Sequence, residues 1–352
     1  MENDILITIV VTIYNKASYV EKCLDSISLQ TDKKYKLIII DDGSEDDSYD
    51  ICKEICKSNH NIRLISCEHT GVAAVRNIGL KLADTKYILF VDGDDTIHQD
   101  TIHDLNEIIE KYDYDLLIFG IFDTMPDGSV INNVSCNDII CTSHNNMKQN
   151  IIKLWSSGLM YSSCNKLFKV QKVRENNILF PDKDFGEDLD FVCRYFMVCS
   201  SMYNTRNCYY FYTQHTASSL SKKFRNDLFD IRKFEYKYMN NFFIDNEVYD
   251  CPEAQEFLAR RHIERIVGCI ENEVSVYNKK SIKKKIYSIN KIVSDQDTID
   301  CIKKSSLKSK KMKILVLPIK YKLPRLSFII GLAMTFVRNT FPKMFLYLKT
   351  KR

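Results

Sequence analysis

Three carboxylates follow an apolar run near residue 90. Residues 87–91 are aromatic or branched and predict a strand buried on both faces, and Asp92, Asp94 and Asp95 stand at its end. Crowded negative charge is costly unless a cation compensates it, and carboxylate oxygens suit Mg²⁺ or Mn²⁺, which typically bridge a carboxylate and a substrate phosphate. The cluster therefore indicates metal-assisted chemistry on a phosphorylated substrate. A solvated acidic turn is an equal alternative for this run alone.

The elements that must position these carboxylates alternate between strands and helices over the first 120 residues. Strands are predicted at residues 5–13, 37–40, 62–65, 87–91 and 116–121. Four helices are predicted among these strands. The first begins at a capping box at residues 18–21, and the others include residues 51–55, 71–83 and 104–112. This alternation predicts an α/β fold with a mostly parallel sheet and helices on both faces. Ligands bind at the carboxyl ends of strands in such a sheet.

The rest of the chain has a different pattern. Residues 122–150 are polar and predict a loop, and a second acidic cluster, Glu187 with Asp188, opens an apolar helix. Residues 225–305 predict charged helices that are poor in glycine and proline.

The charge of the chain is uneven. The whole chain carries +4 and its last 52 residues carry +14 with no acidic residue, so residues 1–300 carry −10. Two apolar segments in this basic region, residues 314–318 and 327–337, are shorter than the ~18 apolar residues that a membrane-spanning helix needs. Their composition predicts a segment lying on an anionic membrane surface, with an ordinary core-packing helix as the alternative. No module that reads nucleic acid accompanies the charge.

Thirteen cysteines are scattered along the chain without a C-x-x-C pair. Their odd number and spacing argue against a zinc site. Since the N-terminus lacks the pattern of a signal peptide, we expect reduced, mostly buried thiols in a cytoplasmic protein.

Four motifs resemble those of family 2 glycosyltransferases of the GT-A fold, of the kind that build bacterial surface or capsular polysaccharides. The motifs are VTIYN at residues 11–15, DDGS at 41–44, GVAAVRN at 71–77 and DGDD at 92–95. The resemblance is strong over residues 1–120 and looser to about residue 220. It implies a nucleotide-sugar-binding half at residues 1–122 and an acceptor-binding half with the catalytic base at 123–224. A helical region at 225–310 and a basic amphipathic tail at 311–352 would follow.

The resemblance also implies the residues that hold the nucleotide-sugar. Thr12 and Tyr14 would hold the base and ribose, with Asn15 beside them in the same motif. Asp42 would accept a hydrogen bond from the imide N–H of uracil, with an Asx turn or a helix cap as its alternative role. Arg76 would reach the diphosphate as a charged donor.

The two acidic clusters supply the chemistry in this resemblance. Asp94 would bind Mn²⁺ or Mg²⁺ directly, Asp92 would meet the ribose or a metal-bound water, and Asp95 is a candidate second ligand. The metal neutralises charge on the departing nucleoside diphosphate. Asp188 would take the proton of the acceptor hydroxyl, supported by Glu187. The alternative for this pair is simple stabilisation at a helix N-terminus.

Two further segments carry weaker signals. Residues 161–168 resemble the Trp-Asn-Lys-Leu stretch near the acceptor cleft of the family, with Cys164 where tryptophan is common. His215 falls where such enzymes often carry a residue that contacts phosphate or metal, although a lone histidine is more often structural. The processive Gln-x-x-Arg-Trp signature is absent, and Trp155 is the only tryptophan. This favours a transferase that adds one sugar at a time.

The resemblance implies an inverting, metal-dependent hexosyltransferase that moves a sugar from a UDP-sugar to a hydroxyl of a lipid-linked glycan at the inner face of the cell membrane. One alternative is a haloacid-dehalogenase-like phosphatase with Asp92 as nucleophile and Asp94 as acid/base. That motif usually lies on the first strand, whereas two βα units precede it here. A catalytically inactive binding protein of the same fold is a further alternative, but it would predict a broken metal or base motif.

Overall fold

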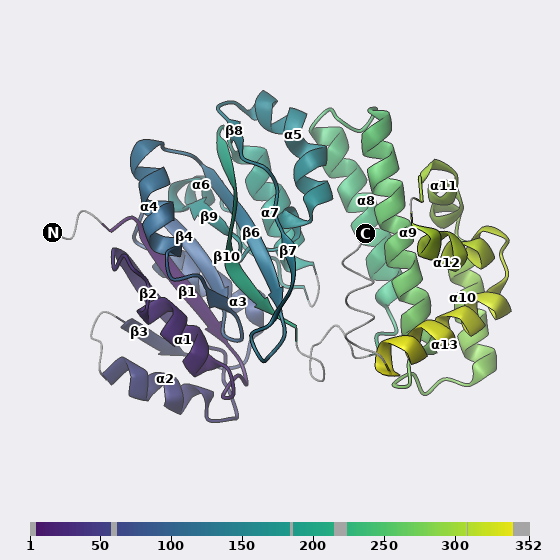
Figure 1. Ribbon diagram of the computed structural model, residues 1–352, viewed down its shortest axis with the longest axis horizontal. Helices are drawn as coiled ribbons and strands as arrows, with labels where there is room; N and C mark the ends of the chain where they lie inside the picture. The colour runs from purple at the N-terminus through teal and green to yellow at the C-terminus, as the bar shows by residue number, and fades with distance from the viewer. Residues whose placement is uncertain (1–4, 58–61, 184–185, 215–223, 308, 341–352) are drawn as a thin grey trace. The chain divides into compact units, whose positions relative to one another are not determined.

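The computed structural model describes residues 5–57, 62–183, 186–214, 224–307 and 309–340 (Figure 1). The chain forms two compact units, residues 1–214 and residues 215–352. The first unit contains all the described residues of the four motifs and both acidic clusters.

A mixed sheet forms the centre of the first unit. Its described strands follow the order β3-β2-β1-β4-β9-β6-β10-β5, with β7 paired to β6 and β8 to β10. The strands are β1 (Ile7–Ile13), β2 (Tyr35–Asp41), β3 (Ile62–Ser66), β4 (Tyr87–Asp92), β5 (Thr96–Ile97), β6 (Leu116–Thr124), β7 (Val130–Val134), β8 (Ile139–Cys141), β9 (Lys166–Lys169) and β10 (Met202–Thr213). Strands β3, β2, β1 and β4 are parallel, whereas β9 pairs antiparallel with both β4 and β6. The predicted α/β class is confirmed.

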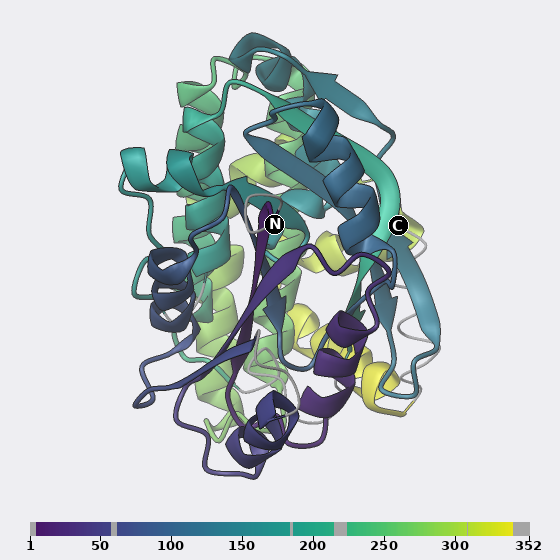
Figure 2. The ribbon, with the colours of Figure 1, turned by 90° about the vertical axis from the view of Figure 1, so that its left-hand side faces the viewer.

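Helices cover both faces of this sheet, and Figure 2 shows α1 and α3 on opposite sides of it. The helices of the first unit are α1 (Val20–Ser28), α2 (Ser48–Lys57), α3 (Val72–Leu82), α4 (Thr101–Lys111), α5 (His144–Ser157), the 3₁₀ turn η2 (Leu159–Tyr161), α6 (Val170–Glu175) and α7 (Glu187–Val198). Right-handed crossovers that step from β1 to β2 to β3 place α1 and α2 on one face, and the crossover that returns from β3 to β4 places α3 on the other face.

Two local predictions were wrong. Helix α1 begins after Tyr19, which makes no side-chain capping bond, so the predicted capping box at residues 18–21 does not form. The polar stretch at 122–150 contains β7, β8 and the first half of α5 as well as loops. Exposed strands at the edge of a sheet lack the continuous apolar runs by which buried strands are recognised.

The second unit is helical, as predicted for residues 225–305. It contains α8 (Leu228–Asp245), α9 (Pro252–Val274), α10 (Ile282–Val293), α11 (Gln296–Lys304), α12 (Lys310–Lys320) and α13 (Pro324–Thr340). No described helix combines the length and hydropathy that crossing a bilayer needs.

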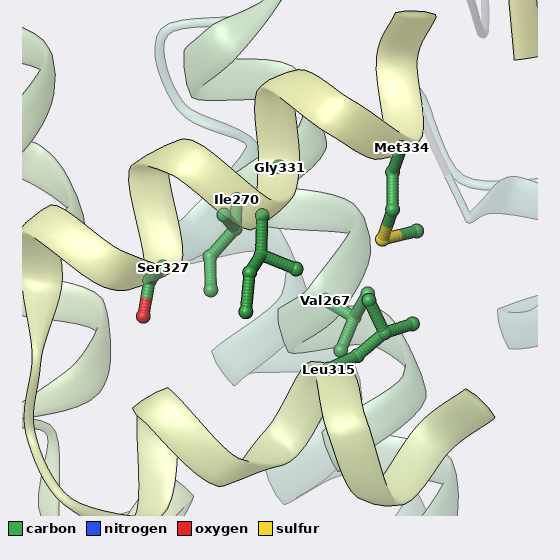
Figure 3. Close-up of a pocket in the computed structure, with 7 residues that line it drawn as sticks. Val267, Ile270, Leu315, Ser327, Gly331 and Met334 are labelled. Atoms are coloured by element: carbon green, nitrogen blue, oxygen red, sulfur yellow. The ribbon is translucent and has the colours of Figure 1, made fainter. Parts of the chain in front are cut away.

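Helices α12 and α13 of the basic tail pack into the second unit. Met312, Leu315, Val316 and Ile319 are buried in one core with residues of α9 and α10. Figure 3 shows the place where α9, α12 and α13 meet around a cavity of about 10 Å³. A single water needs about that volume, so this cavity is a packing gap and holds no ligand. The core-packing alternative therefore applies to one face of these helices.

Candidate functional site

The carboxyl ends of β1, β2 and β4 bring the motif residues to one edge of the sheet. Thr12 lies opposite Asp92 in the parallel register of β1 and β4, and its hydroxyl donates a 3.2 Å hydrogen bond to Oδ1 of Asp92. The backbone N–H of Asp42 donates to the carbonyl of Ile13 over 2.8 Å. Three residues distant in sequence thus share one edge because parallel strands end together.

Arg76 is the centre of the site. Helix α3 packs closely on β1 because Gly79 faces Val10, where a Cβ atom would lie 2.6 Å from a methyl group. The Arg76 side chain is almost wholly buried, with 3% of its surface exposed. Its Nη2 donates to Oδ1 of Asp92 over 2.9 Å, and its Nη1 donates to Oδ1 of Asp188 over 2.8 Å.

This guanidinium joins the two acidic clusters. Nη1 also lies 3.5 Å from Oε1 of Glu187, so one cation serves three carboxylates. Burial opposes its charge, but Asp188 and Asp92 outweigh burial and raise the pKa of Arg76 well above its usual value. Arg76 therefore stays charged. Its predicted contact with a diphosphate remains a prediction, since in this structure the charge is paired with carboxylates.

Helix α7 presents Glu187 and Asp188 in its first turn, as predicted. Gly186 precedes it with φ of +86°, a left-handed conformation that favours glycine. Burial, and next the neighbouring Asp188, raise the pKa of Glu187 above its usual value. The two adjacent carboxyl groups thus differ in environment, which is the arrangement by which one of them can act as base while the other supports it.

Asp94 and Asp95 point into different surroundings. The Lys16 ammonium forms an ion pair with Oδ2 of Asp94, whose side chain is 15% exposed. Asp95 is buried, and it accepts hydrogen bonds from the Tyr210 hydroxyl at 2.7 Å and the Thr213 N–H at 2.8 Å. Burial, followed by Asp92 and Asp94, raises the pKa of Asp95 well above its usual value.

A divalent cation fits the oxygen donors of this cluster in one binding mode. Across the part of the chain that the structure describes, no three His, Cys, Asp or Glu side chains converge as a complete cation cage. Mg²⁺, however, commonly takes one or two carboxylates and completes its shell with substrate phosphates and water. Asp92, which is 33% exposed, and Asp94, which is 15% exposed, are the accessible carboxylates for that mode, whereas the buried Asp95 already accepts two hydrogen bonds.

A second group of residues surrounds Asp42 at the end of β2. Its carboxylate accepts from the N–H groups of Thr70 at 2.8 Å and Gly71 at 2.9 Å, and lies 2.9 Å from Nδ1 of His69. Asp42 thus holds the loop that leads into α3, whereas at the local turn that was its alternative role it is Oδ2 of Asp41 that accepts from the N–H of Ser44. The His69 ring stacks on Tyr14, with ring centroids 3.9 Å apart.

Asn15 shapes the turn that follows β1. It adopts a left-handed conformation with φ of +52°, and its side-chain oxygen accepts from the N–H of Glu45 over 2.8 Å. Asn15 thereby ties the first motif to the DDGS loop. Its predicted contact with the sugar donor stays a prediction.

The segment at 161–168 is buried beneath the site. Cys164 is 2% exposed and lies 3.9 Å from Nη2 of Arg76, and Ser163 donates a 2.7 Å hydrogen bond to Oδ1 of Asp188. Lys166 is fully buried, and burial lowers its pKa to about 7. This buried segment therefore contacts the candidate base Asp188 through the hydroxyl of Ser163.

Sequence reasoning missed three residues that the structure brings to the site, and one predicted residue cannot be placed. His215 lies outside the described residues. The residues missed are Lys16, His69 and Tyr210. Lys16 directly follows a motif residue, so its position was a usable signal, whereas the other two carry no local pattern that distinguishes them from ordinary loop or strand residues. Ser163 lies within the predicted segment 161–168, but its bond to Asp188 was not predicted.

Comparisons with known proteins show which family and which relatives this chain resembles. The model of the family described as "Glycosyl transferase family 2" matches residues 8–176. The chain is similar to the putative glycosyltransferase EpsH of Bacillus subtilis, with 26% identity over 299 residues that cover 82% of this chain and 83% of EpsH. It is also 42% identical over 112 residues to the glycosyltransferase GlyA of Streptococcus pneumoniae, covering 32% of this chain but only 16% of GlyA.

A solved structure shows the same fold. The S. aureus TarS fragment 1–349, solved in complex with UDP-GlcNAc, superposes with a TM-score of 0.64 at 18% identity. The match covers 93% of this chain and 91% of that one.

Proposed function

Since residues 8–176 belong to glycosyl transferase family 2, we propose that this protein is an inverting, non-processive, metal-dependent transferase of a sugar from a UDP-sugar to a glycan hydroxyl. The observation that carries the proposal is the Arg76 guanidinium, which joins the motif aspartate Asp92 to the candidate base Asp188. The presence of UDP-GlcNAc and UDP in the TarS structures supports a uridine nucleotide as the carrier.

Asp188 is the proposed general base. It takes the proton of the acceptor hydroxyl while that oxygen attacks the anomeric carbon of the sugar. The bond from that carbon to the diphosphate breaks on the opposite face, and its electron pair leaves with the nucleoside diphosphate, so the configuration inverts. When bound through Asp94, Mn²⁺ or Mg²⁺ neutralises the charge of this leaving group.

The nucleotide is proposed to lie over the ends of β1 and β2. The Tyr14 ring is partly exposed, and its only stacking partner among the described residues is His69. One face of the ring is therefore open for stacking with a base. Thr12 lies beside Asp92, where a ribose would be held. Recognition of uracil by Asp42 requires its carboxylate to exchange one of its present hydrogen bonds for the imide N–H.

A membrane surface is the proposed docking partner of the second unit. Helices α12 and α13 bury one face but leave large apolar side chains exposed on the other: Ile314, Leu317, Tyr321, Leu326, Ile329 and Phe336. The charged residues of the segment 301–352 are all basic, which complements anionic headgroups, and one of them, Arg338, is paired with Glu271 of α9. The inner face of the cell membrane is also where a lipid-linked acceptor for surface polysaccharide synthesis is presented.

A thermal-shift panel tests the enzyme class. UDP, GDP, dTDP and CMP are each added to the full chain with and without Mn²⁺. We expect UDP to stabilise the protein only with the metal, by about 2.7 kcal/mol at a hundredfold excess over the dissociation constant. Stabilisation by another nucleotide would mean that the donor sugar is carried by that nucleotide and not by UDP. No thermal shift with any nucleotide, together with hydrolysis of a generic phosphate ester, would support the phosphatase alternative. No thermal shift and no hydrolysis would support an inactive binding protein.

A further inference from the structure

The two oxygens of the Asp188 carboxylate have different surroundings. Oδ1 accepts two hydrogen bonds, from Nη1 of Arg76 at 2.8 Å and from the hydroxyl of Ser163 at 2.7 Å. No hydrogen bond from the described residues reaches Oδ2. The Asp188 side chain is 22% exposed, so the carboxylate is open to solvent despite these two bonds.

Ser163 is held in place by the loop around it. The residue is fully buried between η2 and β9. The Lys166 ammonium donates to the carbonyl oxygens of Leu159 at 2.5 Å and Ser162 at 2.6 Å, and the Asn165 amide donates to the Phe119 carbonyl at 2.8 Å. The hydroxyl of Ser163 is therefore fixed before any substrate binds.

We propose that Ser163 is a positioning residue. Together with Arg76 it holds Oδ1 of Asp188 in hydrogen bonds to the protein, so that Oδ2 is the oxygen that receives the acceptor proton. This inference rests on the proposed function and adds a residue to it. Rotation of the Asp188 carboxylate would break both hydrogen bonds to Oδ1, so Oδ2 keeps one direction toward the acceptor hydroxyl.

The groups around Asp188 differ in charge. Arg76 and Glu187 lie beside it, Lys166 and Cys164 lie in the segment beneath it, and Asp92 lies across the guanidinium. Ser163 is the neutral member of this group that touches the base. Its removal therefore changes the hydrogen bonding of Asp188 without changing the net charge of the site.

The test compares Ser163→Ala with Ser162→Ala. The Ser162 hydroxyl accepts from the N–H of Cys164 over 3.1 Å in the same loop, so its variant controls for effects on the loop alone. The assay follows the release of UDP from UDP-GlcNAc, UDP-glucose and UDP-galactose with Mn²⁺, with water as the acceptor, between pH 5 and 9 (about one pH unit apart).

We expect Ser163→Ala to lower kcat about tenfold and to move the acidic limb of the pH profile to higher pH, because the ionised base loses one donor. KM for the UDP-sugar should not change, since Ser163 contacts the base only. Ser162→Ala should keep the profile of the unaltered protein. A profile in Ser163→Ala that matches the unaltered protein would overturn the positioning role.

The experiment also distinguishes failure of the proposed function from failure of the Ser163→Ala variant to fold. Absence of UDP release by the unaltered protein from all three sugars would overturn the proposed function and this inference together. If Ser163→Ala fails to fold, Ser163→Cys retains a weak donor in a side chain of similar shape. It should then show the same displacement of the acidic limb to a smaller extent, and an unmoved limb would contradict the proposal.

Discussion

Arg76 and Asp188 are 112 residues apart in the sequence, and a 2.8 Å hydrogen bond joins their side chains. The same guanidinium bonds Asp92 over 2.9 Å. The motif that ends β4 and the first turn of α7 are thus fixed to each other through one buried cation. A change at Arg76 should therefore affect stability and both halves of the site.

Arg76→Met should destabilise the first unit. Removal of one partner from a buried ion pair costs about 3–5 kcal/mol, and the partial exposure of the three carboxylates places the expected loss near the lower end, about 3 kcal/mol. In a unit of this size that corresponds to a fall in Tm of about 6–12 °C. Arg63→Met, at an exposed position on β3, is the matched control and should leave Tm nearly unchanged. Equal melting temperatures for both variants would contradict the central role of Arg76.

Asp94→Asn should abolish metal-dependent turnover while the protein stays folded. The ion pair with Lys16 is partly exposed, so its loss should cost only about 0–1 kcal/mol. The measurement is the Mn²⁺-dependent part of the thermal shift with UDP, together with UDP release. Asp100→Asn, at a position on the N-terminal side of α4, serves as control. Normal metal-dependent activity in Asp94→Asn would remove the metal assignment.

Asp95→Asn should change how stability depends on pH in the absence of metal. Because burial raises the pKa of Asp95 in the folded state, its stabilising contribution is complete below about pH 4, the usual range of an aspartate, and is lost as pH rises through the raised value. Asparagine does not ionise, so the Tm of the variant minus that of the unaltered protein should increase from pH 4 to pH 8.

The control for this pH series is Asp84→Asn, which alters an exposed carboxylate paired with Lys36. Its Tm difference should be nearly flat over the same range. If the Tm difference for Asp95→Asn were also flat, the ionisation of this buried carboxylate would not affect stability between pH 4 and pH 8. The assigned pH dependence would then be wrong.

Substitutions on the exposed face of α12 and α13 test membrane docking better than deletion of residues 311–352, since that deletion would also remove core residues of the second unit. Leu317→Glu and Phe336→Glu should each weaken binding to phosphatidylglycerol vesicles at least about tenfold, because burial of such a side chain contributes about 1.5–3 kcal/mol. Binding is measured by co-sedimentation, with phosphatidylcholine vesicles for comparison.

Val276→Glu is the matched control for this series. Val276 is exposed in the same unit but lies outside the basic tail. It should bind vesicles as the unaltered protein does. Undiminished binding by both tail variants would mean that this face is not the membrane contact.

The sequence by itself determined the α/β class, the helical second unit and the edge of the sheet at which the site lies. Buried parallel strands such as β1 and β4 leave continuous apolar runs, and their carboxyl ends must meet at one edge, so Thr12 and Asp92 could be assigned to the same edge of the sheet from local pattern. The start of α7 at Glu187 was likewise a local signal.

Only the tertiary structure decided which side chain partners which. Periodicity describes a single element, whereas the bonds of Arg76 to Asp188 and of Ser163 to Asp188 join elements whose separation in space is set by packing. The antiparallel insertion of β9 into the sheet carries Ser163 beneath the base, and no local pattern predicts that pairing. For the same reason, the burial of one face of α12 against α9 could not be read from its basic, amphipathic sequence.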